Sequence, residues 1–238
     1  MVNIGLLIAG GSGTRMHQDI PKQFLTVNEK PVIVYTLEAF QNHPEIDAIA
    51  VVCIEGWEHV LWAYANQFNI TKLKYVVPGG INGQDSIRNG VYELEKYFDS
   101  EDIVLIHDAI RPMVSAAIIS DCIRITKKRG NAVTVIPCAE AMIQTEDGEV
   151  SVGSYPRERL KRTQTPQGFH IGKICDLHRR ALNAGINNSV ASCTLMIEMG
   201  ERVFFSAGSE KNIKLTTVED IDIFKALLVA RRSDWLKD

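Results

Sequence analysis

Short apolar runs alternate along the first half of the chain with stretches whose apolar residues recur every three or four positions. The runs have the length and composition of buried strands, and they cover residues 2–9, 48–53, 73–77 and 103–107. Between the first two, apolar residues from Val32 to Phe40 follow a helical spacing, and Pro31 suits a first helical turn. A strand followed by a helix, repeated four times with short connections, predicts a mainly parallel, Rossmann-like α/β sheet with helices on both faces.

Further helices and another strand are predicted along the rest of the chain. Ile87 and Leu94 belong to a stretch with helical spacing, and Asp85 and Ser86 are suitable N-caps for it. Residues 132–136 form another strand-like run. A last helix is indicated by an apolar stripe, which consists of Ile221, Phe224, Leu227 and Leu228.

The segment 139–162 has a different character. It is polar, its residues alternate only weakly, and Asp147-Gly148 is a typical hairpin turn. We therefore expect a β-arm that protrudes from the fold and offers a docking surface to a second subunit. No internal repeat, low-complexity tract or linker interrupts the rest, so residues 1–238 are expected to form a single domain into which this arm is inserted.

Composition restricts the class of protein. Of 238 residues, 45% are hydrophobic and 23% are charged, and the 26 Lys+Arg against 29 Asp+Glu give a formal net charge of −3. This balance argues against a protein that coats nucleic acid, and the apolar stretch at residues 4–9 is too short to cross a membrane. Five scattered cysteines without a C-x-x-C pair suit reduced thiols, so we expect a cytoplasmic protein rather than a secreted, membrane or disulfide-rich one.

The first strand leads into a glycine-rich turn that carries the strongest chemical signal in the sequence. Gly10, Gly11 and Gly13 let the backbone curl around a ligand so that its N–H groups face phosphate oxygens. Arg15 and Lys22 would neutralise the charge of those oxygens. The turn lacks the Gly-Lys-Ser/Thr ending of a P-loop and the third glycine of a dinucleotide-binding fingerprint. The alternative is a plain turn between a strand and a helix. The presence of two cations, Arg15 and Lys22, favours phosphate binding over this alternative.

Further segments accompany this turn in a fixed order. They are residues 9–16 (AGGSGTRM) with 21–24 (PKQF), 107–112 (HDAIRP), 163–167 (TQTPQ) and 212–217 (NIKLTT). Together they span nearly the whole chain, and they resemble the cytidylyltransferases that act on methylerythritol phosphate or ribitol 5-phosphate. The resemblance implies transfer of CMP from CTP to a polyol phosphate with release of pyrophosphate, Mg²⁺ as cofactor, and a homodimer formed through the arm.

The resemblance also implies roles for individual residues. Arg15, Lys22 and Lys214 would be catalytic cations, and Asp108 would hold the Mg²⁺. The nucleotide would contact Ala9, Gly10, Gly11, Gly13, Gly80, Ser86 and Ala109. The acceptor would contact Arg111, Thr165 and, across the dimer interface, Arg157. For Ser86 a simple helix cap is the alternative, and Arg157 is on sequence alone one of several cations of the arm.

The chemistry of the residues after the strand at 103–107 agrees with these roles. Asp108 stands at the carboxyl end of that strand, where ligands bind in open α/β folds, and a carboxylate beside phosphates is a natural Mg²⁺ ligand. A helix N-cap is the alternative for Asp108, and a structural salt bridge is the alternative for Arg111. His107 is expected in the core, because an ionised phosphate nucleophile needs no base. Lys214 lies in a short strand-like run. Without the resemblance, it would be interpreted as an ordinary solvent-exposed lysine.

The chain departs from the family's pattern mainly on the acceptor side. Gly83 stands where an arginine is usual, Ala141 where a threonine is common, and residues 190–192 (VAS) where acceptor-facing polar groups are usual. The glycine-rich turn is closer to the ribitol-phosphate branch of the family. Ribitol 5-phosphate is therefore the expected acceptor, with 2-C-methyl-D-erythritol 4-phosphate as the alternative and a catalytically weakened CTP-binding protein as a remoter one.

Replacing either cation of the turn tests its role. We expect Arg15→Ala and Lys22→Ala each to lower kcat by about 100-fold or more, because each would remove charge that stabilises the transferring phosphates. Thermal unfolding should stay at the wild-type temperature. Pyrophosphate release from CTP measures the effect, and a variant that keeps near-wild-type turnover would show that this turn does not bind the triphosphate.

Overall fold

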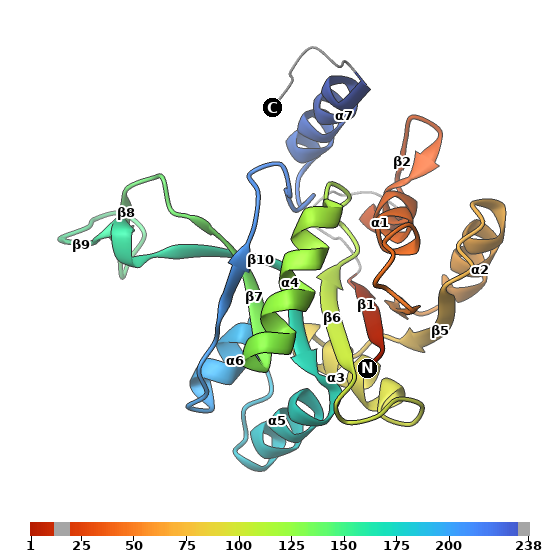
Figure 1. Ribbon diagram of the computed structural model, residues 1–238. Helices are drawn as coiled ribbons and strands as arrows, with labels where there is room; N and C mark the ends of the chain where they lie inside the picture. Colours follow the sequence, from red (N-terminus) through yellow and green to blue (C-terminus); the bar gives the residue numbers. More distant parts are fainter. Residues whose placement is uncertain (12–19, 233–238) are drawn as a thin grey trace.

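The computed structural model describes residues 1–11 and 20–232, whose main feature is a seven-stranded sheet in the order β11-β7-β10-β6-β1-β4-β5 (Figure 1). Its parallel part consists of β1 (Asn3–Ala9), β4 (Ala48–Cys53), β5 (Leu73–Pro78) and β6 (Ile103–Asp108). β1 is central, because Leu6 is paired with Ala50 of β4 on one side and with Ile106 of β6 on the other. The strands predicted for this part of the chain are confirmed, each to within one residue at either end.

The other half of the sheet contains an antiparallel strand that the sequence pattern does not reveal. β10 (Lys161–His170) runs antiparallel to both β6 and β7 (Asn131–Pro137), whereas β11 (Phe205–Ala207) is parallel to β7. The sequence of β10, KRTQTPQGFH, is polar and contains a proline, so it lacks the alternation of a strand. Its register with β7 shifts between Thr163 and Gln167, so the proline lies where the ladder is interrupted.

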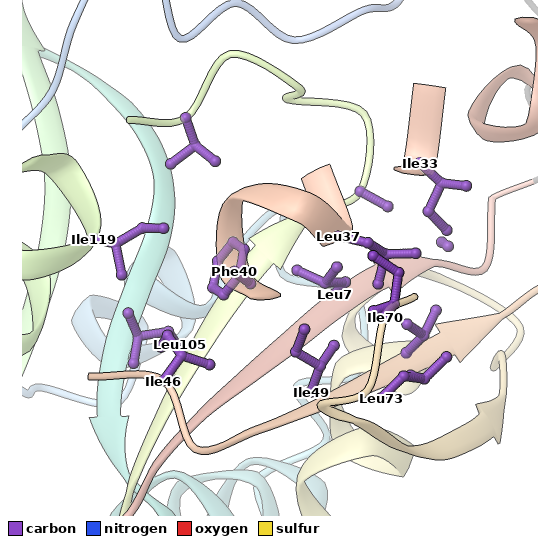
Figure 2. Packing of buried hydrophobic residues seen from close by; sticks show 14 of the residues in the cluster. Leu7, Ile33, Leu37, Phe40, Ile46, Ile49, Ile70, Leu73, Leu105 and Ile119 are labelled. Carbon is purple, nitrogen blue, oxygen red and sulfur yellow. The ribbon is translucent and has the colours of Figure 1, made fainter. Parts of the chain in front are cut away.

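One face of the sheet carries the larger apolar cluster. Leu7, Ile49 and Leu105 of adjacent strands point to this face, which is covered by α1 (Val32–Gln41), α2 (Glu58–Gln67) and α4 (Ala116–Arg129). Figure 2 shows part of the cluster, in which Leu37 and Phe40 of α1 gather with these strand residues. Burial of such side chains is the main favourable contribution to folding, at about 25 cal/mol per Å² of apolar surface.

The opposite face is equally covered. The alternate strand residues Leu6, Ala50 and Val104 belong to a second cluster with α3 (Gly83–Leu94), α5 (Ile171–Asn183) and α6 (Ser192–Glu198). In the view of Figure 1, α4 lies in front of the sheet and α3 behind it. Because side chains alternate along a strand, two buried faces require continuous apolar runs, and the expectation of helices on both faces is confirmed.

Two helices begin differently from the expectation. α3 follows Asn82, whose side-chain oxygen accepts a hydrogen bond from the Asp85 N–H at 2.9 Å, so the expectation that Asp85 or Ser86 caps this helix is wrong. Asn82 takes this role because a short polar side chain at that position reaches the amide three residues on. Pro31 occupies the N-cap of α1 itself, directly before the first helical turn at Val32.

The segment 139–162 contains the expected arm, which Figure 1 shows projecting away from β7 and β10. Its strands β8 (Met142–Gln144) and β9 (Gly153–Tyr155) form a separate two-stranded antiparallel sheet. Between them the Asp147 carboxylate accepts hydrogen bonds from the N–H groups of Glu149 and Val150, and Gly148 has a φ of 82° that favours glycine. The short helix η3 (Arg157–Arg159) then leads into β10.

A third, smaller cluster joins parts of the chain that are distant in sequence. Before α1 come the short elements η2 (Lys22–Phe24), β2 (Thr26–Val27) and β3 (Lys30–Pro31). The last helix, α7 (Val218–Arg232), buries Phe224 against Tyr35 of α1, with ring centroids 5.1 Å apart. The predicted apolar stripe of this helix thus has a partner. None of the helices in the described residues combines the length and apolar character that a membrane-spanning segment needs.

Gly168 of β10 lies beneath α4 with no room for a side chain, because a Cβ there would be 2.2 Å from Thr126 Oγ1. We expect Gly168→Ala to lower the free energy of unfolding by about 1–3 kcal/mol, since α4 or β10 must shift. Urea unfolding followed by circular dichroism measures the change. As a control, the same substitution in a Thr126→Ala background lacks the clashing hydroxyl and should cost less; an equal cost in both backgrounds would contradict this explanation.

Candidate nucleotide-binding site

A cavity of about 780 Å³ lies where parallel strands of the sheet end. Ala9 ends β1, Gly79 follows β5 and Asp108 ends β6, so the cavity is at the carboxyl edge, where open α/β folds bind ligands. Its size is that of a small-molecule site. The expected site residues that line it are Ala9, Gly10, Gly11, Lys22, Gly80, Ser86, Asp108, Arg111, Thr165 and Lys214.

Two other expected residues are placed elsewhere. Ala109 does not line the cavity; it is buried, and both its N–H and its carbonyl are hydrogen-bonded within the fold. Arg157 lies exposed on the arm, where its guanidinium donates to the Ala139 carbonyl at 3.0 Å. Gly13 and Arg15 lie outside the described residues.

The start of the glycine-rich turn is anchored by a side chain whose role was missed in the sequence. The amide of Gln23 is 1% exposed, and its nitrogen donates to the Ala9 carbonyl at 2.7 Å and to the Gly11 carbonyl at 3.0 Å. Gln23 lies in η2 next to Lys22, so the same short helix supplies a cation and holds the turn. Its place directly after Lys22 is the signal that could have revealed it.

A second glycine segment, Gly79-Gly80, lies against α3. The Gly80 N–H donates to the Ser86 hydroxyl at 3.0 Å, and a Cβ on Gly80 would lie 2.4 Å from the Cβ of Asp85, so only glycine fits. A Cβ on Gly10 would lie 3.2 Å from the Ser86 hydroxyl, so the two glycine segments meet at this side chain. Ser86 lies inside α3 and, with the two glycine segments, shapes a wall of bare backbone that a base can approach closely.

Asp108 forms the centre of a charged cluster in the cavity. One carboxylate oxygen accepts from Arg111 Nε at 2.9 Å and the other from Lys214 Nζ at 3.0 Å. Arg111 also donates to the carbonyl of the buried Asn212 at 2.8 Å, which fixes the guanidinium from a second side. Burial alone would raise the pKa of Asp108, but the Lys214 ammonium and the Arg111 guanidinium outweigh it and hold this pKa below its usual value. The carboxylate is therefore ionised at neutral pH.

His107 is a core residue, as expected. It is fully buried, and burial lowers its pKa to about 4, so the imidazole is neutral at pH 7. The Thr165 hydroxyl accepts from the Asp108 N–H at 3.0 Å. The Arg111 carbonyl, 3.3 Å from His107 Nε2, can only accept, so Nε2 carries the proton of the neutral ring and Nδ1 accepts from the Thr165 hydroxyl at 3.0 Å. These bonds fix Asp108 and Arg111 relative to β10, and they occupy the Thr165 hydroxyl.

The alternative interpretation of Asp108 and the strand-like placement of Lys214 are both wrong. Asp108 is not a helix N-cap, because α4 begins at Ala116 and the Ser115 side chain caps it. Lys214 does not lie in a strand. It belongs to an irregular stretch between β11 and α7, which one backbone hydrogen bond, from Leu215 to Ile110, ties to the turn after β6.

Asp108 could hold a metal ion here. Within residues 1–11 and 20–232, no three His, Cys, Asp or Glu side chains gather in a way that could bind a metal on their own. In the described part of the chain, the carboxylates that line the cavity are those of Glu55 and Asp108, so a cation bound at the charged cluster would have Asp108 as a ligand and complete its shell with ligand phosphates and water. Such a donor set suits Mg²⁺.

Comparisons with known sequences agree with an anion-binding cavity of this kind. The family model described as IspD, 2-C-methyl-D-erythritol 4-phosphate cytidylyltransferase, matches residues 4–230. A ribitol-5-phosphate cytidylyltransferase of Lacticaseibacillus paracasei is 43% identical over 225 residues, which cover 94% of this chain and 96% of that protein. A 2-C-methyl-D-erythritol 4-phosphate cytidylyltransferase of Clostridium botulinum is 38% identical over 228 residues, covering 95% and 97%.

Solved structures have the same fold. The 4-diphosphocytidyl-2C-methyl-D-erythritol synthase from Anaerococcus prevotii has a TM-score of 0.81 and 24% identity, with 96% of each chain covered. The 2-C-methyl-D-erythritol 4-phosphate cytidylyltransferase from Thermus thermophilus has a TM-score of 0.74 and 26% identity, covering 94% of this chain and 98% of that one. With its family match from residue 4 to 230 and these relatives along nearly its whole length, the chain belongs to the IspD family of cytidylyltransferases and is an enzyme that transfers CMP from CTP.

Proposed function

We propose that the acceptor of this enzyme is ribitol 5-phosphate, so that its products are CDP-ribitol and pyrophosphate. The observation that carries the proposal is a single cavity that combines two glycine segments with the charged cluster of Asp108, Arg111 and Lys214. The glycine segments would bind CTP through their backbone, and the cations would neutralise phosphate charge. Relatives at 38–43% identity named as ribitol-5-phosphate cytidylyltransferases support this acceptor.

In the proposed reaction an oxygen of the acceptor phosphate attacks the α-phosphorus of CTP. The new P–O bond forms as the bond to the departing pyrophosphate breaks. Lys22 and Arg15 would hold the β- and γ-phosphates, and Lys214 would stabilise charge at the α-phosphate. Arg111, already oriented by two hydrogen bonds, would hold the acceptor phosphate. Positioning and charge neutralisation would then supply the catalysis, with no proton transfer by the neutral His107.

Mg²⁺ is the proposed cofactor, and Asp108 fits the role of its protein ligand. The carboxylate is ionised and lines the cavity, and each of its oxygens keeps a lone pair beyond the hydrogen bond that it accepts. Mg²⁺ held there would supply positive charge that neutralises the phosphates of the substrates. The ion pair with Lys214 would keep both the carboxylate and the ammonium at the place where the α-phosphate binds.

The arm is the proposed dimer contact. Its apolar side chains are exposed to solvent, namely Met142, Ile143, Val150, Val152 and Tyr155. Pairing with a second copy would bury them. Because Arg157 does not line the cavity of its own chain, its proposed contact with the acceptor requires the arm of the partner to reach the site. The proposed location is the cytoplasm, where CTP is available.

Transfer to 2-C-methyl-D-erythritol 4-phosphate is the second candidate, favoured by the Clostridium botulinum relative. Pyrophosphate release with CTP and Mg²⁺ distinguishes the two when ribitol 5-phosphate, 2-C-methyl-D-erythritol 4-phosphate, xylitol 5-phosphate and glycerol 3-phosphate are compared. We expect kcat/KM for ribitol 5-phosphate to exceed that for the methylerythritol compound by about 100-fold. The reverse order would replace the proposed acceptor. CTP binding without turnover on any acceptor would indicate a weakened, CTP-binding protein.

The role of Asp108 in metal binding has its own test. Asp108→Asn should raise the Mg²⁺ concentration for half-maximal rate by about tenfold or more, because the charge that attracts the cation is lost. Asp176→Asn, which removes an exposed carboxylate from α5, serves as the control and should leave this concentration unchanged. Equal Mg²⁺ dependence of Asp108→Asn and wild type would exclude Asp108 as the ligand.

A further inference from the structure

Part of the cavity wall is an irregular segment whose side chains offer little to a polar ligand. Residues 184–191 connect α5 to α6, and Val190, Ala191 and Ser192 line the cavity. Val190 is 94% exposed, and neither it nor Ala191 has a hydrogen-bonding side chain. The Ser192 hydroxyl is buried and finds no hydrogen-bond partner among the described residues. A ligand at this wall contacts mainly backbone and apolar side chains. The conformation of the backbone therefore determines which ligands fit.

Gln84 holds this segment from α3. Its amide nitrogen donates to the Ile186 carbonyl at 2.8 Å, and its amide oxygen accepts from the Ser189 N–H at 2.7 Å. The side chain is 3% exposed, so both bonds are shielded from water. Loss of a buried partner leaves the remaining backbone groups unpaired, which is costly. Asn82, at the N-cap of the same helix, adds a bond to the Asn187 carbonyl at 3.0 Å.

Gln167 holds the end of the segment from β10. Its amide oxygen accepts from the Cys193 N–H at 3.0 Å, and its nitrogen donates to the Cys193 sulfur at 3.3 Å. Gln167 is also 3% exposed. Two buried glutamines on different elements thus fix the backbone on either side of Val190–Ser192, a stretch that has no strand partner of its own.

The position of this wall points to the acceptor. In the proposed function the nucleotide contacts the glycine segments and Ser86, and the cations bind phosphates. The rest of the cavity wall, on β10 and at Val190–Ser192, is then available to the acceptor. Gln84 stands two residues before Ser86, and Gln167 two residues after Thr165. The elements that hold the wall, α3 and β10, therefore also carry residues of the base end and of the charged end of the cavity.

We propose that Gln84 and Gln167 are positioning residues that set acceptor selectivity by fixing the backbone of the Val190–Ser192 wall, an inference that rests on the proposed transfer to a polyol phosphate. Gln84 does not line the cavity and acts only through the segment that it holds, whereas Gln167 also lines the cavity. The wall selects a linear polyol phosphate by shape, and the two amides keep that shape.

Gln84→Leu tests this role, with Asn89→Leu as the matched control. Asn89 lies on the same helix, and its amide makes one long, exposed bond to Pro78 at 3.4 Å. We expect Gln84→Leu to raise KM for ribitol 5-phosphate by about tenfold and to leave the Kd of CTP, measured by titration without acceptor, at the wild-type value. Hydrogen exchange of amides 184–192 should be faster in Gln84→Leu and unchanged in Asn89→Leu.

A second variant covers the case in which Gln84→Leu does not fold. Gln84→Met has nearly the volume of glutamine and loses both bonds without introducing a charge, so its acceptor KM should also rise, by about tenfold. An acceptor KM at the control value in these variants, or an equal weakening of CTP and acceptor binding, would overturn the inference. Absence of turnover in the wild type would instead overturn the proposed function, and the inference with it.

Discussion

The two ion pairs of Asp108 are the interaction on which the site depends. A partly buried carboxylate is costly unless it is paired, and here Lys214 and Arg111 come from different parts of the chain to pair it. Lys214 belongs to the irregular stretch before α7, so this contact ties the C-terminal part to the end of β6. Removal of either cation would leave one carboxylate oxygen of Asp108 without its hydrogen-bond partner. The same pairs place positive charge at the carboxyl edge of the sheet before any substrate binds.

Buried amide side chains give the rest of the cavity its shape. Gln23 anchors the glycine-rich turn, the Asn212 side chain donates to the Thr165 carbonyl, and Gln84 with Gln167 supports the wall before α6. Each amide has both a donor and an acceptor, so one side chain can satisfy two backbone groups of an irregular segment. Loops at the edge of a sheet have no ladder of backbone hydrogen bonds to a neighbouring strand. The amide side chains satisfy their backbone N–H and carbonyl groups instead. The parallel strands position the edge of the cavity, and the buried amides fix the conformation of the segments that line it.

The strands β1, β4, β5 and β6 and helix α1 could be predicted because both faces of the sheet are buried, which produces continuous apolar runs such as Ile4–Ala9. β10 could not, since its strand state comes from pairing with β6 and β7 rather than from its own residues. Among the site residues, Gly80, Asp108 and Lys214 were found through motifs, and the structure places them in one cavity. Gln84 carries no sequence signal, because its role depends on Ile186 and Ser189, more than 100 residues away.

The support of the Val190–Ser192 wall from outside has an evolutionary consequence. The buried amides that hold the wall lie on α3 and β10, and Thr194 of α6 bonds the backbone of Ala191, so the exposed side chain of Val190 can be exchanged without rebuilding the backbone. Mutations there would alter the substrate and leave the scaffold and the chemistry of nucleotide transfer intact. A family with this construction can drift between acceptors through a few substitutions at its rim. Relatives named for ribitol 5-phosphate and for methylerythritol phosphate, at 43% and 38% identity to one chain, are what such drift would leave behind.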